Sequence, residues 1–62
     1  MLSLEQQLVL IFLRNSRKEV KFADIFPWAA ENEVEHPDVV ARSLIDLGLI
    51  EADHALGVYR VL

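Results

Sequence analysis

Two short segments combine a histidine with carboxylates, and these side chains are ligands for divalent metal ions. The first is EVEHPD at residues 33–38, which contains His36, and the second is EADH at residues 51–54, which ends at His54. Neither segment has ligand spacing as specific as that of the H-E-x-x-H motif. We therefore interpret both as solvated turns and assign no metal site and no cofactor.

Covalent catalysis has little support in the sequence. The chain has no cysteine, which excludes disulfides and thiolate zinc sites. The three serines, Ser3, Ser16 and Ser43, have no histidine close in sequence, so no nucleophile is paired with a base. The sequence therefore predicts a protein without catalytic residues.

Charged residues are unevenly distributed along the chain. Four of the six basic residues lie between positions 14 and 21, whereas residues 31–62 hold seven acidic and two basic residues. The net charge of −4 repels polyanions at long range. A basic cluster can contact phosphates, but cations also suit a helix C-terminus and a solvated turn, and we favour that interpretation.

Length and composition favour one small domain, residues 1–62, that associates with a partner. A chain of this size buries only about 60% of its unfolded surface, and small domains often need a disulfide, a metal or a partner. The chain has no cysteine and 53% of its residues are apolar. Of these three means of stabilisation, we therefore expect a protein partner. The longest apolar run has six residues, far below the ~20 that span a membrane. No targeting signal is recognisable, so we expect a cytoplasmic protein.

Capping signals predict where the first two helices begin. Ser3 and Gln6 fit the S-x-x-E/Q capping box, and the helix that they start should end near residue 14 or 15. A second helix begins with Asp24 as its N-cap, which places Pro27 at the third helical position, where no helical bond is lost. The apolar residues expected on the buried face of this helix are Ile25, Trp28 and Ala29.

The third helix has the clearest pattern. Pro37 suits its first position. Val40, Leu44 and Leu47 recur at i, i+4 and i+7, which gives one apolar stripe. Gly48 follows the last of them, at the position where a left-handed C-cap is expected.

Strands are expected after the third helix. Residues 49–53 and 58–62 read as a hairpin, and Gly57 can supply a positive φ for its turn. Residues 20–22 are a candidate for one further short strand. Alternation along the last strand directs Tyr59 and Val61 toward the core, and Val58, Arg60 and Leu62 toward solvent.

Two stretches of the chain are similar to a known family. Residues 20–53, VKFADIFPWAAENEVEHPDVVARSLIDLGLIEAD, resemble the helix-turn-helix core of winged-helix domains, and residues 48–62, GLIEADHALGVYRVL, resemble their wing. The resemblance covers nearly the whole chain. It implies an α+β fold, a small winged helix with three helices and a C-terminal two-stranded β-hairpin.

The first helix has more apolar residues than one packed face requires. Leu4, Leu8 and Ile11 form a stripe at i, i+4 and i+7. Burying each would contribute roughly 1.5–3 kcal/mol, so we expect another protein, most simply a second copy, to cover the stripe. The alternative is that the fold itself buries it. The core face that the winged-helix pattern implies for this helix is Val9, Leu10, Phe12 and Leu13.

The charges bear on the choice between two functions. Most winged-helix domains insert their third helix into DNA, so the resemblance implies a DNA-binding transcription regulator. Here Glu33, Glu35, Asp38 and Asp46 surround that helix and would repel phosphates. We therefore predict a protein–protein interaction module, homodimeric through the first helix, whose acidic face meets a basic protein partner. The DNA-binding alternative would use Arg14, Arg17, Lys18, Lys21, Arg42 and Arg60 for phosphate contacts.

Overall fold

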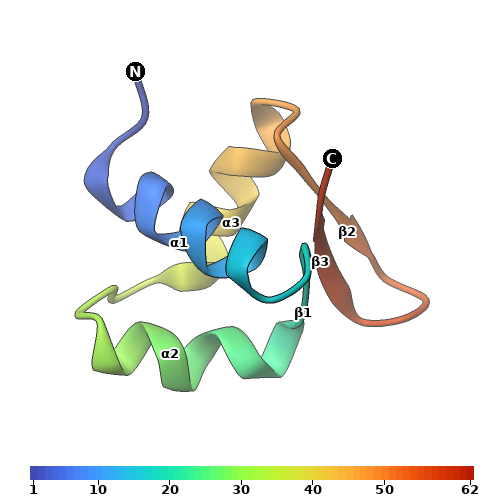
Figure 1. Ribbon diagram of the computed structural model, residues 1–62, viewed down its shortest axis with the longest axis horizontal. Coiled ribbons are helices and arrows are strands. Elements are labelled where there is room, and N and C mark those ends of the chain that lie inside the picture. The colour runs from blue at the N-terminus through green and yellow to red at the C-terminus, as the bar shows by residue number, and fades with distance from the viewer.

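Three α-helices and one three-stranded antiparallel sheet make up the structure, a computed structural model that describes residues 1–62 (Figure 1). The fold is α+β, and the sheet lies at one side of the helices (Figure 1). No helix has both the length and the apolar character needed to cross a membrane. In chain order the elements are α1 (Leu4–Asn15), β1 (Glu19–Lys21), the 3-10 helix η1 (Phe22–Asp24), α2 (Ile25–Glu31), α3 (Pro37–Asp46), β2 (Ile50–Asp53) and β3 (Val58–Val61).

Helix α1 begins with the predicted capping box. The backbone N–H of Gln6 donates to the Ser3 hydroxyl at 3.1 Å, and the Ser3 N–H donates to the side-chain carbonyl of Gln6 at 2.8 Å. These bonds satisfy donors that no helical carbonyl can reach. The Gln6 amide also donates to the Ser43 hydroxyl at 3.0 Å, so the same side chain ties the start of α1 to α3.

The turn between α1 and β1 passes through two left-handed residues. The φ angle is 61° at Arg17 and 67° at Lys18, and the Lys18 N–H donates to the Leu13 carbonyl at 2.9 Å. This backbone region costs about 1–2 kcal/mol for a residue that has a Cβ. The tight turn is what carries the chain from α1 into the adjacent strand.

The start of α2 differs from its prediction. Asp24 makes no side-chain capping bond, because η1 runs directly into α2 and gives Asp24 a helical backbone with φ −77° and ψ −15°. A capping side chain requires an extended backbone at that residue. The predicted inner face is confirmed, since Ile25 and Ala29 are buried and Trp28 packs against the core. The Trp28 ring stacks on Phe12 of α1 with centroids 4.5 Å apart.

Helix α3 begins at Pro37, as predicted, but its buried stripe differs from the predicted one. The buried residues are Pro37, Ala41 and Leu44, and Val40 is partly buried beside them. Leu47 is 57% exposed, so its prediction as a core residue is wrong. The helix ends one residue earlier, and Leu47 therefore lies in the following turn, where the helical period no longer sets its direction.

The end of α3 is a Schellman motif. Gly48 has φ 75° and donates its N–H to the Ile45 carbonyl at 2.9 Å, while the Leu49 N–H donates to the Leu44 carbonyl at 3.1 Å. These bonds satisfy carbonyl groups that the helix leaves unpaired. The prediction of a left-handed C-cap at Gly48 is confirmed.

Strand β3 is the central strand of the sheet, with β1 on one side and β2 on the other. Strands β2 and β3 pair antiparallel across a turn in which Gly57 has φ 69°, the conformation expected for it. Because β1 also pairs with β3, the sheet has one strand more than the hairpin alone. The extra strand ends before Phe22, which was expected inside it and instead begins η1.

The two faces of β3 are less distinct than alternation predicts. Tyr59 and Val61 pack against the core as expected, and Arg60 and Leu62 lie outside it. Val58 is only 6% exposed, so its predicted exposure is wrong. Val58 pairs with Lys21 of β1 and Asp53 of β2, and the side chains of directly paired residues lie next to each other on one face of a sheet. The neighbour on β1 was not foreseen, because β1 was only a candidate strand.

One apolar cluster joins the helices to the sheet. The inner face of α1 supplies its largest share, which confirms the predicted core face, with Phe12 partly buried against it. Residues from β1, α2, α3 and β2 complete the cluster. Its eight buried members are Val9, Leu10, Leu13, Val20, Ile25, Ala41, Leu44 and Ile50.

Gly48→Ala should lower the free energy of unfolding by about 1–2 kcal/mol, because a Cβ disfavours a positive φ. No atom lies within 4 Å of the added Cβ, so the loss would report backbone strain alone. Urea denaturation followed by tryptophan fluorescence measures the loss. Gly48→Asn is the matched control and should lose less, since Asn tolerates this conformation better. Unchanged stability of Gly48→Ala would contradict the left-handed C-cap.

Candidate interaction surfaces

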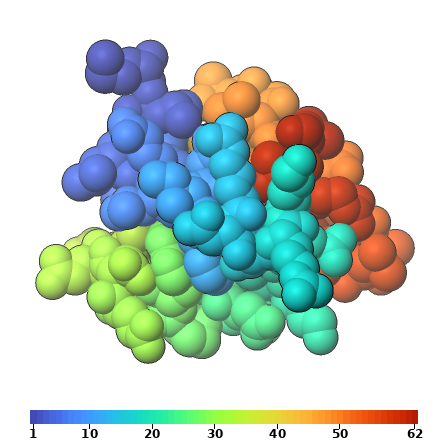
Figure 2. Space-filling model, viewed as in Figure 1, coloured from blue at the N-terminus to red at the C-terminus, as the bar shows by residue number.

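The outer face of α1 exposes the apolar stripe predicted from its sequence. Leu4 is 72% exposed and Ile11 is 51% exposed, whereas Leu8 between them is half-buried. The opposite face of the helix is buried in the core. Figure 2 shows α1, in blue, on the surface of the molecule that faces the viewer. The fold therefore leaves most of this stripe in contact with water.

The predicted acidic residues fall into two groups. Glu33 and Glu35 lie in the loop between α2 and α3, at the edge of a shallow depression that Glu5 and His36 also line. His36 precedes α3 at the N-cap position, but its side chain makes no capping bond. This group is a set of exposed carboxylates with no cation among the residues that line the depression.

The second acidic group lies on α3 itself. Asp46 approaches Arg42 with 4.0 Å between Oδ1 and Nε, and both side chains are largely exposed, so this contact is weak. Asp38 forms no ion pair, and it lines a separate hollow. The acidic face predicted as one surface is therefore divided between the α2–α3 loop and α3.

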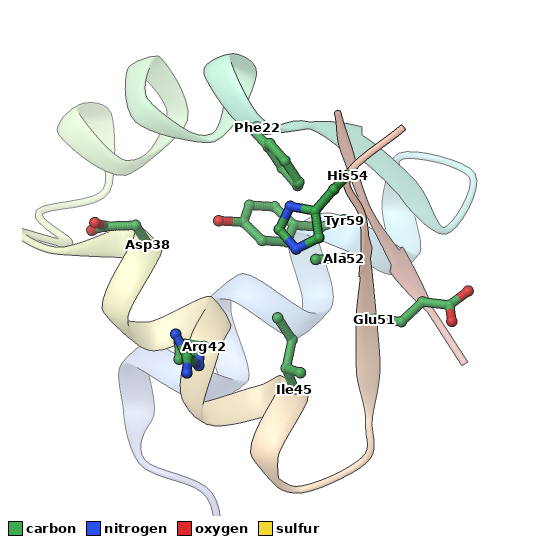
Figure 3. Close-up of a pocket in the computed structure, with 8 residues that line it drawn as sticks. All are labelled: Phe22, Asp38, Arg42, Ile45, Glu51, Ala52, His54 and Tyr59. Carbon is green, nitrogen blue, oxygen red and sulfur yellow. The ribbon is translucent and has the colours of Figure 1, made fainter. Parts of the chain in front are cut away.

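This separate hollow lies between α3, the β2–β3 hairpin and η1, and we call it the α3–hairpin hollow (Figure 3). Its volume is about 630 Å³. Asp38, Arg42 and Ile45 line it from one face of α3, at i, i+4 and i+7. Tyr59 lines it from β3 and Phe22 from η1, so the hollow combines an apolar floor with charged groups at its edge.

Three aromatic rings meet in the α3–hairpin hollow. The Phe22 and Tyr59 rings are tilted by 53° with centroids 4.6 Å apart, and His54 approaches Phe22 edge-on at 5.7 Å. The backbone holds Phe22 there, because its N–H donates to the Gly57 carbonyl at 2.9 Å. The η1 turn is thus fastened to the hairpin, and the rings form one wall of the hollow.

The surroundings of Tyr59 in the hollow affect the ionisation of its phenol. Burial raises the pKa of the Tyr59 phenol, and the negative charge of Asp38 raises that pKa further. Figure 3 shows the hydroxyl of Tyr59 directed toward the side of the hollow that carries Asp38. The phenol therefore lies in surroundings that are partly desolvated and electrostatically negative.

Arg60, a predicted phosphate contact, is neutralised by carboxylates on the outer face of the sheet. Its Nη2 lies 2.9 Å from Glu19 and 3.5 Å from Asp53, and its Nη1 lies 3.2 Å from Glu51. Hydrogen bonds to Glu19 and Glu51 raise the pKa of the Arg60 guanidinium. A phosphate would have to compete with three carboxylates for this cation.

The remaining predicted phosphate contacts form what we call the basic cluster, around the α1–β1 turn. All four side chains are exposed, and none forms an ion pair. Figure 2 shows this turn, in cyan, away from the acidic α2–α3 loop at the left. The members of the basic cluster are Arg14, Arg17, Lys18 and Lys21.

The two histidines have different surroundings and do not come together with enough carboxylates to form a metal site. His36 lies at the acidic α2–α3 loop, and His54 lies against the Phe22 ring. No group of three or more His, Cys, Asp or Glu side chains is arranged to hold a metal ion.

Sequence reasoning missed the aromatic wall of the α3–hairpin hollow. It assigned Phe22 to the end of a strand and Tyr59 to the core, and did not bring the two together. The strand pairing is the signal that could have done so. Because Lys21 pairs with Val58, the next residue, Phe22, lies at the hairpin turn close to Tyr59.

Comparisons with protein-family models, curated proteins and solved structures found no match to this chain. The candidate functional surfaces of the molecule are the stripe on α1, the acidic groups, the basic cluster and the α3–hairpin hollow.

Tyr59 should ionise above the ordinary tyrosine pKa of about 10, and Asp38→Asn should lower its pKa partway. Burial, the larger cause, persists in the variant, so the shift should not vanish. Because the pKa is higher in the folded state, the free energy of unfolding should fall as the pH rises above about 10. Tyr59 is the only tyrosine, so phenolate absorbance measures it directly. An equal shift in Asp46→Asn, which removes a charge outside the hollow, would contradict a specific effect of Asp38.

Proposed function

We propose that this protein is a non-catalytic, winged-helix protein-binding module that forms a homodimer through α1. The stripe of Leu4, Leu8 and Ile11 is the observation that carries the proposal, because it lies opposite the face of α1 that the core uses. The two groups of carboxylates, in the α2–α3 loop and on α3, would bind a basic protein partner.

The order of the elements supports a winged helix. A helix and a short strand come first, two further helices follow, and a hairpin ends the chain, in the order that the sequence resemblance implies. Helix α3 directly precedes the hairpin, as the recognition helix precedes the wing in that family. The pairing of β1 with β3 agrees with the short strand that was a candidate from the sequence.

The stripe on α1 supports a weak dimer. Leu4 and Ile11 are exposed, and removing each from water would contribute roughly 1.5–3 kcal/mol. A second copy is the simplest cover, since most oligomers are symmetric pairs of identical chains. Helix α1 has 12 residues and is about 18 Å long, so its outer face alone is smaller than the roughly 800 Å² per partner of a standard interface. The dimer should therefore depend on concentration.

The charges near α3 support a basic protein over DNA as the further partner. Arg60 is surrounded by carboxylates, and Arg42 is the only other Lys or Arg in α3 and the hairpin, so these elements offer phosphates little free positive charge. Asp38, Glu33 and Glu35 form no ion pair and are exposed. Complementary charge of this kind speeds the encounter with a basic surface and selects against acidic ones.

Ile11→Glu should shift the population from dimer to monomer without unfolding the chain. Ile11 is exposed in the monomer, so a carboxylate there should leave the fold intact. Burying that carboxylate in an apolar interface is unfavourable. Light scattering over a concentration series measures the mass, and circular dichroism checks that the fold persists.

Leu56→Glu is the matched control for this experiment. Leu56 is an exposed apolar residue in the hairpin turn, so the change in charge and size is similar but lies away from α1. Its mass should follow that of the wild type. A wild type that stays monomeric at every concentration, or a Leu56→Glu variant that dissociates equally, would contradict an interface on α1.

A DNA-binding regulator is the second candidate, because the basic cluster is exposed and free of ion pairs. Titration with random duplex DNA, followed by amide chemical shifts, separates the two functions. Under the protein-binding proposal, any shifts should stay within the basic cluster and fade as salt approaches physiological strength. Strong shifts along α3 at physiological salt would instead favour the regulator.

A further inference from the structure

We propose that the α3–hairpin hollow binds an arginine side chain of a protein partner, with the guanidinium held between the Asp38 carboxylate and the rings of Phe22 and Tyr59. The inference rests on the proposed function for the presence of a basic partner. It adds the side chain that is recognised and the place where it is held.

Asp38 supplies the charge that the guanidinium would meet. It is the only carboxylate lining the hollow that is not already bound to a cation, because Glu51 contacts Arg60 at 3.2 Å. Figure 3 shows the Glu51 carboxylate on the far side of the hairpin from the rings. Asp38 lies on the side toward which the Tyr59 hydroxyl points, with its oxygens directed outward at the rim of the hollow. Because this side chain is exposed, it would turn about its χ1 angle to meet the guanidinium. A carboxylate can accept two parallel hydrogen bonds from a guanidinium, which fixes its orientation as well as its position.

The aromatic wall supplies the second contact. Guanidinium groups stack on aromatic faces and are attracted by the negative potential of those faces. Phe22 and Tyr59 are tilted by 53°, so their rings form a corner rather than a flat stack. Ile45 and Ala52 add apolar surface beside the rings, against which the methylene stem of an arginine can pack.

The same features disfavour other occupants. An anion would approach Asp38 with like charge, and a lysine ammonium is a compact, strongly hydrated charge that neither stacks nor bonds in a bidentate way. Arg42 at the edge of the hollow carries the same sign as the proposed ligand. Its side chain is 79% exposed and lies beside Asp46, outside the ring corner, so it leaves Asp38 accessible.

The hollow is accessible in the proposed dimer. No residue of α1 lines it, so a second copy seated on Leu4 and Ile11 would leave it open. Its volume of about 630 Å³ lies within the roughly 300–1,000 Å³ typical of clefts that hold a ligand group. An arginine can therefore enter from the surface without disturbing the core.

Amide chemical-shift titration of the full chain with a blocked Gly-Arg-Gly peptide tests the inference. The arginine peptide should bind weakly, with a Kd in the millimolar range, and should shift the amides of Phe22, Asp38, His54 and Tyr59. The same peptide with lysine should bind more weakly. The peptide with citrulline, which has the shape of arginine without its charge, should cause no shift at these positions.

Matched variants separate a specific contact from general charge. Asp38→Asn should weaken arginine binding about tenfold, as expected when a hydrogen bond between charged groups is lost. Glu5→Gln removes one negative charge away from the hollow and should change the Kd less than twofold. Tyr59→Phe keeps the ring and loses the hydroxyl, so it should still bind.

Equal binding of the citrulline peptide, or equal losses in Asp38→Asn and Glu5→Gln, would overturn the arginine site. Shifts spread evenly over all exposed carboxylates would overturn it too, while leaving the proposed basic partner intact. A failure of the proposed function would look different, because a polybasic peptide would then cause no shifts at the acidic groups and the wild type would show no dimer.

Discussion

Burial of the inner face of α1 is the interaction on which the rest of the structure depends. Val9, Leu10 and Leu13 provide three of the eight residues in the core cluster, and the other five come from four elements. Each such side chain contributes roughly 1.5–3 kcal/mol, a large share of the about 5–15 kcal/mol that stabilises a typical domain. With so small a core, the other helices and the sheet must all pack against this one face, and the positions of the surface groups follow from that packing.

Features of the fold that depend on neighbouring residues could be predicted from the sequence. The capping box of Ser3 and Gln6 and the left-handed Gly48 involve only bonds within a few residues. The errors have two causes. The 3-10 turn η1 gives Asp24 a helical backbone, so its side chain does not cap α2, and the sequence pattern did not indicate this turn. The exposure of Val58 depends on its pairing with the distant strand β1, which the sequence left uncertain.

The candidate sites also include one that depends on local spacing and others that depend on contacts between distant segments. The members of the stripe on α1 follow from the helical period, so residue spacing was sufficient to identify them. Whether the fold buries the stripe was left open by the sequence, and the structure shows that Leu4 and Ile11 are exposed. The α3–hairpin hollow depends on the pairing of β1 with β3, which brings Phe22 beside Tyr59 from a distant part of the chain. The positive charge of Arg60 suggested a phosphate contact from the sequence alone. In the structure, carboxylates from both neighbouring strands contact Arg60, and the sequence did not indicate this pairing.

The proposed dimer surface on α1 and the proposed arginine site in the α3–hairpin hollow can be occupied at the same time, because they lie on different sides of the helices. Figure 1 shows α1 in front of α3, and the hollow in Figure 3 is lined by α3 and the hairpin without α1. Pairing through α1 would stabilise a small fold by mass action. It would also place two hollows in one particle, and a partner that carries two arginines at a matching distance could occupy both. The second contact would then be intramolecular, and linked sites of this kind can exceed the single-site affinity by about 10²–10⁴. A weak arginine contact becomes selective in this way for partners with the right spacing, without any enlargement of the site.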